Sequence, residues 1–203
     1  MTARPQAQVL GAGGHAKVVI ATLEEAGHEV VAVWDDDAAR WGTQVLGVQV
    51  AGPVAAAPMT TPTVIGIGDN RARAAVAAAR ALPWLTVVHP RAWIHRSVTL
   101  GAGTVVFAGA MIQPDAVLGA HVIVNTSASI DHDCRLGDHV HLAPGVRLCG
   151  SIDLGEGALL GVGAVVRPGA RVGAWATIGA GGVVIQPVPA GVTVVGIPAR
   201  ARR

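Results

Sequence analysis

The chain is poor in the residues that build a core from large side chains. Aromatic residues make up 3% of its 203 residues, and it contains no tyrosine and one phenylalanine. Hydrophobic residues nevertheless account for 51% of the chain, and alanine and valine supply most of them. Small side chains of this kind favour closely packed, repetitive backbone over a large globular core.

Several classes of protein are excluded by what the sequence lacks. Two cysteines, Cys134 and Cys149, make neither a disulfide framework nor a metal motif. A formal net charge of +2 argues against a dedicated nucleic-acid binder. No run approaches eighteen apolar residues, so no membrane span is expected. The N-terminal segment MTARPQAQVL lacks a charged-then-apolar leader, and we therefore expect a cytoplasmic protein.

A six-residue repeat runs from Ile94 to Val184. Every sixth residue in this stretch is Ile, Leu or Val: Ile94, Leu100, Val106, Ile112, Leu118, Val124, Ile130, Leu136, Leu142, Leu148, Leu154, Leu160, Val166, Val172, Ile178 and Val184. Four residues after each of them lies a small or β-branched residue, such as Ala110, Cys134 or Val146. A helix repeats every three to four residues and a plain strand every two, whereas hexapeptide repeats are typical of parallel β-helices. We expect a triangular β-helix with eighteen residues in each coil.

The residues before the repeat indicate a separate α/β domain. Strands are expected at 8–10, 29–34 and 63–67. Helices are expected at 16–26 and from Asp69 or Asn70, as the N-cap, to residue 82. Alternating strands and helices predict a parallel sheet that binds ligands at the carboxyl ends of its strands. The fold class is therefore an α/β Rossmann-like domain at 1–88 followed by an all-β parallel β-helix at 89–203.

The first strand ends in a glycine-rich turn, Gly11-Ala12-Gly13-Gly14-His15-Ala16. Glycines let the backbone approach a phosphate, and the free N–H groups of a helix start attract anions. A charged His15 would add to that attraction, and Asp35 and Asp36 would accept hydrogen bonds from a ribose or a base. Because the domain has only half of a dinucleotide sheet, a mononucleotide fits better than NAD. A purely structural turn is the alternative.

Polar and titratable residues crowd onto about one coil, between Asn125 and His141. His132 and Asp133 stand outside the inward set, so a histidine base beside an orienting carboxylate is expected there. Gly150 lies eighteen residues after His132 and should stack directly upon it, with its N–H available to an oxyanion. His141 lies half a coil away, so it can meet His132 only across a subunit boundary. His121 and His139 also stack, but two ligands are too few for a metal site and none is expected.

These residues together resemble the sialic-acid O-acetyltransferase and bacillosamine N-acetyltransferase type of sugar acyltransferase. The motifs that carry the resemblance are Gly11-Ala-Gly-Gly-His15-Ala-Lys17, Asp35-Asp36, Ile67-Gly68-Asp69-Asn70, Asn125, His132-Asp133-Cys134, Leu136-Gly137-Asp138, His141 and Gly196-Ile-Pro-Ala-Arg200. The resemblance implies a left-handed β-helix, acetyl-CoA as the donor and a nucleotide-linked amino sugar as the acceptor. It also implies a homotrimer with active sites between subunits.

The resemblance also implies roles for individual residues. It makes His132 the general base and Asp133 its orienting acid, where some relatives carry the longer Glu. It assigns acetyl-CoA binding to His141, Gly150, Val162 and Ala180. It assigns substrate binding to Gly13, Gly14, His15, Asp35, Asp36, Gly68 and Asn125. The basic tail, Arg200, Arg202 and Arg203, is either a contact for the phosphates of CoA or a solvated terminus.

Three other functions remain open from the sequence. A histidine base serves hydroxyl acceptors as well as amines, so a sugar O-acetyltransferase of the same fold is a variant of the main hypothesis. A zinc-dependent lyase similar to the gamma carbonic anhydrases would need three histidines that converge between subunits. A nucleotide-sugar sensor without activity would keep the glycine-rich turn but would not need acetyl-CoA.

Overall fold

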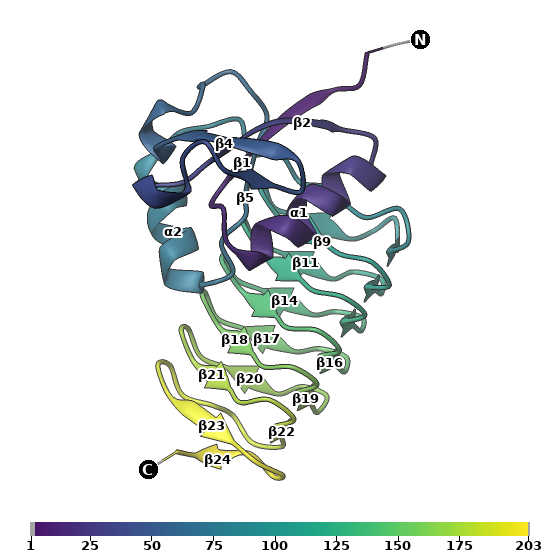
Figure 1. Cartoon of the computed structure of the whole chain (residues 1–203). Coiled ribbons are helices and arrows are strands. Elements are labelled where there is room, and N and C mark those ends of the chain that lie inside the picture. Colours follow the sequence, from purple (N-terminus) through teal and green to yellow (C-terminus); the bar gives the residue numbers. More distant parts are fainter. Residues whose placement is uncertain (1–2, 203) are drawn as a thin grey trace.

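The computed structural model describes residues 3–202. An N-terminal α/β domain lies against one side of a parallel β-solenoid, and the chain runs from the top of the first to the far end of the second (Figure 1). Met1, Thr2 and Arg203 lie outside the described residues. None of the helices within residues 3–202 has the length and apolarity to cross a membrane.

The N-terminal domain is a five-stranded sheet with two helices, of which α1 packs against β1 and β2 and α2 against the edge strand β5. The strand order is β3-β4-β2-β1-β5, and only β3 runs antiparallel to its neighbour. The strands are β1 (Gln6–Leu10), β2 (Glu29–Trp34), β3 (Gln44–Val45), β4 (Val48–Gly52) and β5 (Thr63–Ile65). The helices are α1 (Gly14–Glu25) and α2 (Asn70–Ala79), and two 3₁₀ turns span Ala38–Arg40 and Val54–Ala56.

Most of the elements expected in this domain are present, but several begin or end at other residues than predicted. Asp69 caps α2, since its carboxylate accepts from the N–H of Ala72. Helix α1 begins at Gly14 instead of residue 16, and α2 ends at Ala79 instead of residue 82. The hairpin β3–β4 was not predicted. Its two short strands are joined by Leu46 and Gly47, which both have positive φ.

The solenoid has three flat faces, which we name by their strand numbers. The eight-strand face consists of β6 (Val87–Val88), β9 (Val105–Val106), β12 (Ile123–Val124), β15 (His141–Leu142), β18 (Leu159–Leu160), β21 (Thr177–Ile178), β23 (Thr193–Val195) and β24 (Arg200–Ala201). The six-strand face consists of β7 (Trp93–Ile94), β10 (Met111–Ile112), β13 (Ser129–Ile130), β16 (Arg147–Leu148), β19 (Val165–Val166) and β22 (Val183–Val184). The five-strand face consists of β8 (Thr99–Leu100), β11 (Val117–Leu118), β14 (Arg135–Leu136), β17 (Asp153–Leu154) and β20 (Arg171–Val172).

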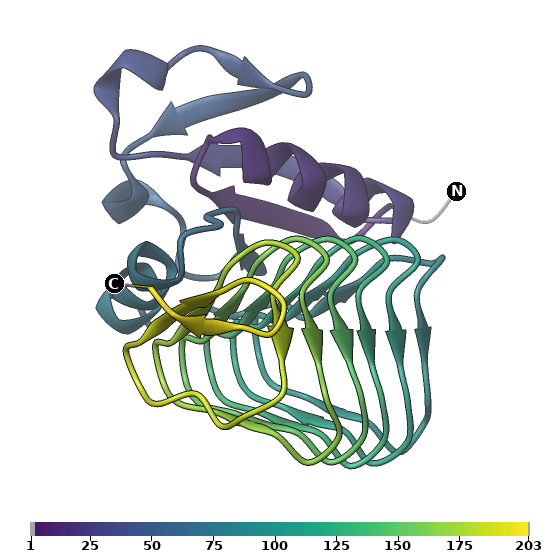
Figure 2. The ribbon, with the colours of Figure 1, turned by 90° about the horizontal axis from the view of Figure 1, so that it is seen from below.

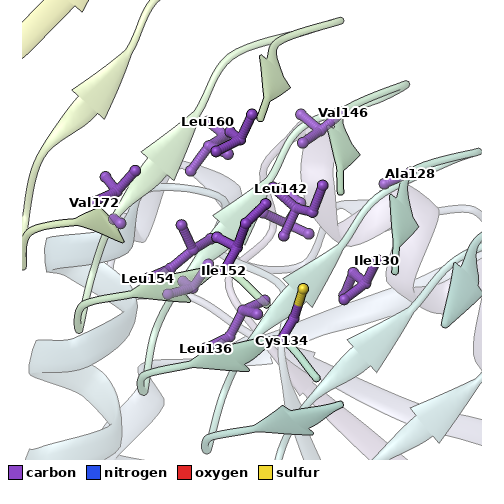
Figure 3. Close-up of a cluster of buried hydrophobic side chains, with 14 of the residues drawn as sticks. Ala128, Ile130, Cys134, Leu136, Leu142, Val146, Ile152, Leu154, Leu160 and Val172 are labelled. Carbon is purple, nitrogen blue, oxygen red and sulfur yellow. The ribbon is translucent and has the colours of Figure 1, made fainter. Parts of the chain in front are cut away.

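The hexapeptide repeat determines the interior of the solenoid. Each strand from β6 to β19 pairs in parallel with the strand eighteen residues later, as in the pair Ile112 and Ile130, so the expected coil length is confirmed. The last coil is shorter, since Thr177 pairs with Thr193, and β24 pairs antiparallel with β23. The repeated aliphatic residues from Val106 onward are buried, and Figure 3 shows Ile130, Leu142 and Leu160 among the side chains that fill the core. Cys134 is one of these core residues, and burial raises the pKa of its thiol to about 11.

The corners of the coils carry the left-handed backbone that the repeat requires. It falls three residues after each repeated aliphatic residue from Leu100 to Ile178. Glycine holds this position in several coils, and in others it is held by residues such as His121, Asp133 and His139, with φ between 54° and 60°. A second group of corner glycines is required because successive coils approach so closely there that no side chain fits between them. A Cβ on Gly137 would lie 2.7 Å from the backbone nitrogen of Glu156 in the next coil.

The N-terminal domain covers the upper part of the eight-strand face. Outward-facing Val105 and Ile123 and the neighbouring Phe107 are buried in one cluster with Val19 of α1 and Val9 of β1. Figure 2 shows α1 and β1 along one side of the stacked coils. The next outward residue in this column is His141, in register with Ile123, so a polar side chain appears where the apolar contact between the domains ends.

Candidate active site

A cavity of about 570 Å³ opens at the carboxyl ends of β1, β2 and β5. Its lining residues come from the glycine-rich turn, the acidic residues after β2 and the face of α2: Gly11, Gly13, Gly14, His15, Asp35, Asp36, Asp37, Arg40, Val54, Gly66, Ile67, Gly68, Ala72 and Val76. Six of the seven residues predicted to bind the substrate are in this set. Asn125 is the exception.

The glycine-rich turn presents an uncapped helix end to the cavity. Gly11 has φ of +97°, and a Cβ there would lie 2.6 Å from Cγ1 of Ile67, so no other residue fits. No side chain caps the N-terminus of α1 at Gly13. The first N–H groups of α1 and the positive end of its dipole therefore face the cavity, which suits a phosphate.

The two aspartates after β2 have different roles. Both carboxylate oxygens of Asp35 accept from backbone N–H groups, those of Ala12 at 2.6 Å and Asp37 at 2.9 Å. Asp35 therefore holds the glycine-rich turn in place, although it also lines the cavity. Asp36 is exposed, and one of its carboxylate oxygens accepts a hydrogen bond from the N–H of Val54. Its other oxygen makes no hydrogen bond within residues 3–202, and we propose it as the acceptor for ribose or base.

His15 is a neutral residue, which differs from the charged side chain expected beside a phosphate. Burial, together with the nearby charge of Arg73, lowers its pKa to about 4. Its ring packs against Phe107 with centroids 5.5 Å apart and lies 6.0 Å from the ring of His141. At neutral pH His15 therefore acts on a ligand as an uncharged hydrogen-bonding group.

His141 joins the solenoid to the cavity. Its Nδ1 lies 3.1 Å from the carbonyl oxygen of Gly68, which lines the cavity, and its Nε2 lies 3.3 Å from Nδ2 of Asn125. Asn125 therefore reaches the site through His141 and not through the cavity itself. Burial is the main cause that lowers the pKa of His141 to about 4.

His132 and Asp133 form a dyad at the corner between the six-strand and five-strand faces. Nδ1 of His132 lies 2.7 Å from Oδ2 of Asp133, so the shorter Asp makes direct contact without the extra methylene of Glu. The carboxylate accepts a hydrogen bond from Nδ1–H of His132, which leaves the lone pair of Nε2 available to accept a proton. This hydrogen bond also raises the pKa of His132 above its ordinary value of 6.5.

Gly150 lies directly against His132, as the eighteen-residue coil predicts. The N–H of Ser151 donates to the carbonyl oxygen of His132 at 2.9 Å, which joins the two coils. A Cβ on Gly150 would lie 2.6 Å from Cε1 and 2.7 Å from Nε2 of His132. Within residues 3–202 the N–H of Gly150 has no backbone acceptor, so it is free to donate to a ligand.

Replacing Asp133 by Asn should change the pH dependence of turnover. The base works only when His132 is neutral, so activity falls as the pH drops through its raised pKa. Without the carboxylate the pKa returns toward 6.5, and the acid limb of kcat/KM should move to lower pH. The plateau should fall by at least about 10-fold, because the amide no longer selects the Nδ1–H tautomer. A profile of kcat/KM between pH 5 and 9 checks this, and an unchanged acid limb would contradict it.

The remaining residues assigned to acetyl-CoA lie at another corner. Val162 and Ala180 stack between the eight-strand and six-strand faces, where the N–H of Gly181 donates to the carbonyl of Val162. Val162 is 57% exposed. Gly150 is at a different corner of the same chain, so one CoA molecule would meet all three only between two chains. Arg200 and Arg202 are exposed at the end of the solenoid, and Arg203 lies outside the described residues.

The sequence did not single out two basic residues of this region. Arg40 lines the cavity and donates to the carbonyl of Ala12 and to Asp37. Arg73 is buried between the domains and lies near both His15 and His141. No signal in the sequence distinguishes Arg73 from Arg71, which is exposed on the same helix, and the solenoid acceptors of Arg73 belong to coils far away in the sequence.

Comparison with known proteins gave matches over nearly the whole chain. The PglD N-terminal domain family matches residues 7–79. A histidine variant of perosamine N-acetyltransferase from Caulobacter crescentus, in complex with CoA and GDP-perosamine, is 41% identical with a TM-score of 0.92, over 98% of this chain and 97% of that one. The acetyltransferase domain of PglB from Neisseria gonorrhoeae, in complex with acetyl coenzyme A, is 36% identical with a TM-score of 0.90, over 98% and 100%.

A third solved structure, WeeI from Acinetobacter baumannii, is 27% identical with a TM-score of 0.85, over 97% of this chain and 99% of that one. The search of curated proteins gave no match. The predicted fold class, an α/β domain followed by a left-handed parallel β-helix, is confirmed by these similarities.

Proposed function

The chain belongs to the sugar acetyltransferases of the hexapeptide β-helix type, and from this premise we propose that it transfers the acetyl group of acetyl-CoA to the amino group of a nucleotide-linked amino sugar. The observation that carries the proposal is the His132–Asp133 dyad stacked on the free N–H of Gly150. The relatives crystallised with CoA and GDP-perosamine support a GDP-linked acceptor.

The proposed reaction is a direct transfer without a covalent enzyme intermediate. The acceptor amine attacks the thioester carbonyl carbon, and a C–N bond forms. Nε2 of His132 takes the proton from the amine while Asp133 stabilises the charged imidazole. The N–H of Gly150 donates to the oxyanion of the tetrahedral intermediate. The C–S bond then breaks, and the proton passes from His132 to the sulfur of the departing CoA.

We further propose that each active site is shared between two chains of a homotrimer. The cavity lies beside His141 on the eight-strand face, whereas His132 lies at the opposite corner of the coil. Trp93 and Met111 support the packing of chains, since these outward residues of the six-strand face are 47% and 46% exposed and pair in register. A trimer of 20.4 kDa chains with threefold symmetry would close such an interface.

Mixing two inactive variants tests the shared site. His132→Ala removes the base from one side of the site, and His141→Ala removes a residue from the other side. When the two chains are co-expressed, about a quarter of the sites should combine an intact His132 with an intact His141, because chains assemble at random. Activity of the mixture should therefore return to about a quarter of wild type. Activity no greater than the sum of the two variants alone would mean that each chain holds a complete site.

Release of free CoA thiol tests the reaction itself. The protein with acetyl-CoA and GDP-perosamine should release one thiol per acetylated sugar, and a GDP-sugar with a hydroxyl in place of the amine should give none. Release with the hydroxyl sugar alone would favour the O-acetyltransferase variant. Absence of release with either sugar, or with the matching UDP-linked sugars, would overturn the proposed function.

Two alternatives belong to other classes. A zinc-dependent lyase would need three histidines that converge between subunits, and stoichiometric zinc in the purified protein would favour it. A sensor without activity would have no use for a base, its orienting carboxylate and a free N–H in adjacent coils.

A further inference from the structure

Arg73 of α2 is a buried cation without an acidic partner. Its side chain is 1% exposed, and all five of its N–H groups have acceptors. These acceptors are the carbonyl oxygens of Ile67, Gly68, His121 and His139 and the Oδ1 of Asn70, at 2.6 to 3.3 Å. None of them is a carboxylate, and no ion pair to Arg73 exists in the described part of the chain. The guanidinium is therefore satisfied by hydrogen bonds without a direct ion pair, and the nearby carboxylate of Asp69 favours its charge.

The acceptors of Arg73 belong to both domains. His121 and His139 lie at the same corner in successive coils, so the guanidinium bridges two coils of the solenoid. Its neighbour Asn70 donates to the carbonyl of Gly157, in the coil after these. Helix α2 is thereby fixed to three consecutive coils, and the loop before it is fixed at Gly68.

The carbonyl oxygen of Gly68 connects this arrangement to His141. It accepts from Nη1 of Arg73 at 3.2 Å and from Nδ1 of His141 at 3.1 Å. A carbonyl only accepts, so the hydrogen of a neutral His141 must be on Nδ1, and Nε2 keeps its lone pair. The amide of Asn125, at 3.3 Å from Nε2, is a donor and agrees with this tautomer.

The charged and titratable groups around His141 oppose its protonation. Arg73 approaches from α2 and His15 from α1, while Asn125, on the solenoid side, carries no charge. Asp69 is the N-cap residue of α2, and its carboxylate accepts a hydrogen bond from the N–H of Ala72. Burial first, and the charge of Arg73 second, hold the pKa of both His141 and His15 at about 4.

We propose that Arg73 is a positioning residue for His141: it holds the Gly68 carbonyl and keeps His141 as the neutral Nδ1–H tautomer. The lone pair of Nε2, which faces the amide of Asn125 in the free protein, then accepts a hydrogen bond from an N–H group of the substrate in place of Asn125. His141 then orients a ligand and does not donate to the thioester oxygen, which is left to the N–H of Gly150. Two ligands supply such an N–H group, the amine of the sugar and the amides of the pantetheine arm. The identity of the ligand rests on the proposed function, whereas the tautomer does not.

Nitrogen-15 spectra of the full-length protein labelled at its eight histidines test the tautomer directly. His141→Asn assigns the signals of His141. In the wild type His141 should be the neutral Nδ1–H form from pH 8 down to pH 5.5. Its Nε2 signal should shift when CoA or GDP-perosamine is added separately, and the ligand that shifts it is the donor. An Nε2–H tautomer, a cationic ring at pH 6, or no shift with either ligand would overturn the proposal.

Arg73→Met then tests the role of the guanidinium, with Arg71→Met as the matched control. Arg71 is exposed on the same helix and lies over the ring of Trp175, 4.7 Å from its centroid. In Arg73→Met the pKa of His141 should rise by about one unit or more, and the neutral ring should populate both tautomers. Arg71→Met should leave both unchanged. If His141 behaves alike in the two variants, Arg73 has only a structural role and the proposal fails.

The wild-type spectra need no variant, so they decide the question even if Arg73→Met does not fold. They also need no turnover. A protein that shows the expected tautomer but releases no CoA thiol would count against the proposed function and leave the role of Arg73 intact.

Discussion

Replacing His132 by alanine should lower kcat by about 10²–10⁴-fold, the usual contribution of a positioned general base. The KM for acetyl-CoA should change little, because the side chain acts mainly on the proton that moves in the transition state. The structure gives the reason: Asp133 holds the imidazole through Nδ1 at 2.7 Å, and only Nε2 is left to accept the proton.

His95→Ala is the matched control for this experiment. His95 lies in the solenoid, where its Nδ1 is hydrogen-bonded to Ser97 and its ring lies 6.2 Å from that of Trp93. Its removal should leave kcat within about twofold of wild type. Steady-state kinetics of thiol release measure both variants. Activity of His132→Ala within about threefold of wild type would remove His132 from the role of base.

Replacing Gly150 by alanine should lower kcat/KM by about 10²-fold, although the variant keeps the backbone N–H. The added Cβ would lie 2.6 Å from Cε1 of His132, which is closer than two carbons can approach. The imidazole must therefore rotate or the coil must shift, and a displacement of about 1 Å in a catalytic group costs about that factor. The damage should be confined to the site, because the added Cβ collides with the exposed imidazole of His132.

Gly191→Ala is the control for the glycine substitution. Gly191 has φ of +71° and open space around its Cα, so alanine there adds backbone strain of about 1 kcal/mol without a collision. Its activity should stay close to that of wild type while its thermal stability falls. Thermal melting and kinetics measured on both variants separate the two effects. Full activity in Gly150→Ala would show that the position of the His132 imidazole does not require a glycine at residue 150.

The regular hexapeptide repeat explains why part of the site was predictable from the sequence. Once the period of six indicated a coil of eighteen residues, residues eighteen apart had to stack. His132 and Gly150 follow this rule, as do Val162 and Ala180. The glycine-rich turn was predictable for a different reason, since Gly11 adopts a backbone conformation and meets a neighbour that only glycine tolerates.

Contacts between the two domains were not predictable in this way. Arg73 reaches carbonyls 48 and 66 residues further along the chain, and His141 reaches Gly68 over 73 residues. No repeat links these positions. The individual roles within the cavity were also hidden, because Asp35 and Asp36 are adjacent and chemically identical, yet Asp35 holds the turn and Asp36 keeps one oxygen free.

The sequence by itself determined the eighteen-residue length of each coil, the residues that face inward, and the stacking of His132 on Gly150. These follow from local spacing and from the limited space at each corner, which act on every coil alike. Only the tertiary structure decided how α2 docks on the coils and which nitrogen of His141 carries the proton. Docking depends on a buried guanidinium that finds acceptors in three separate segments, and such a match exists only after the whole chain has folded.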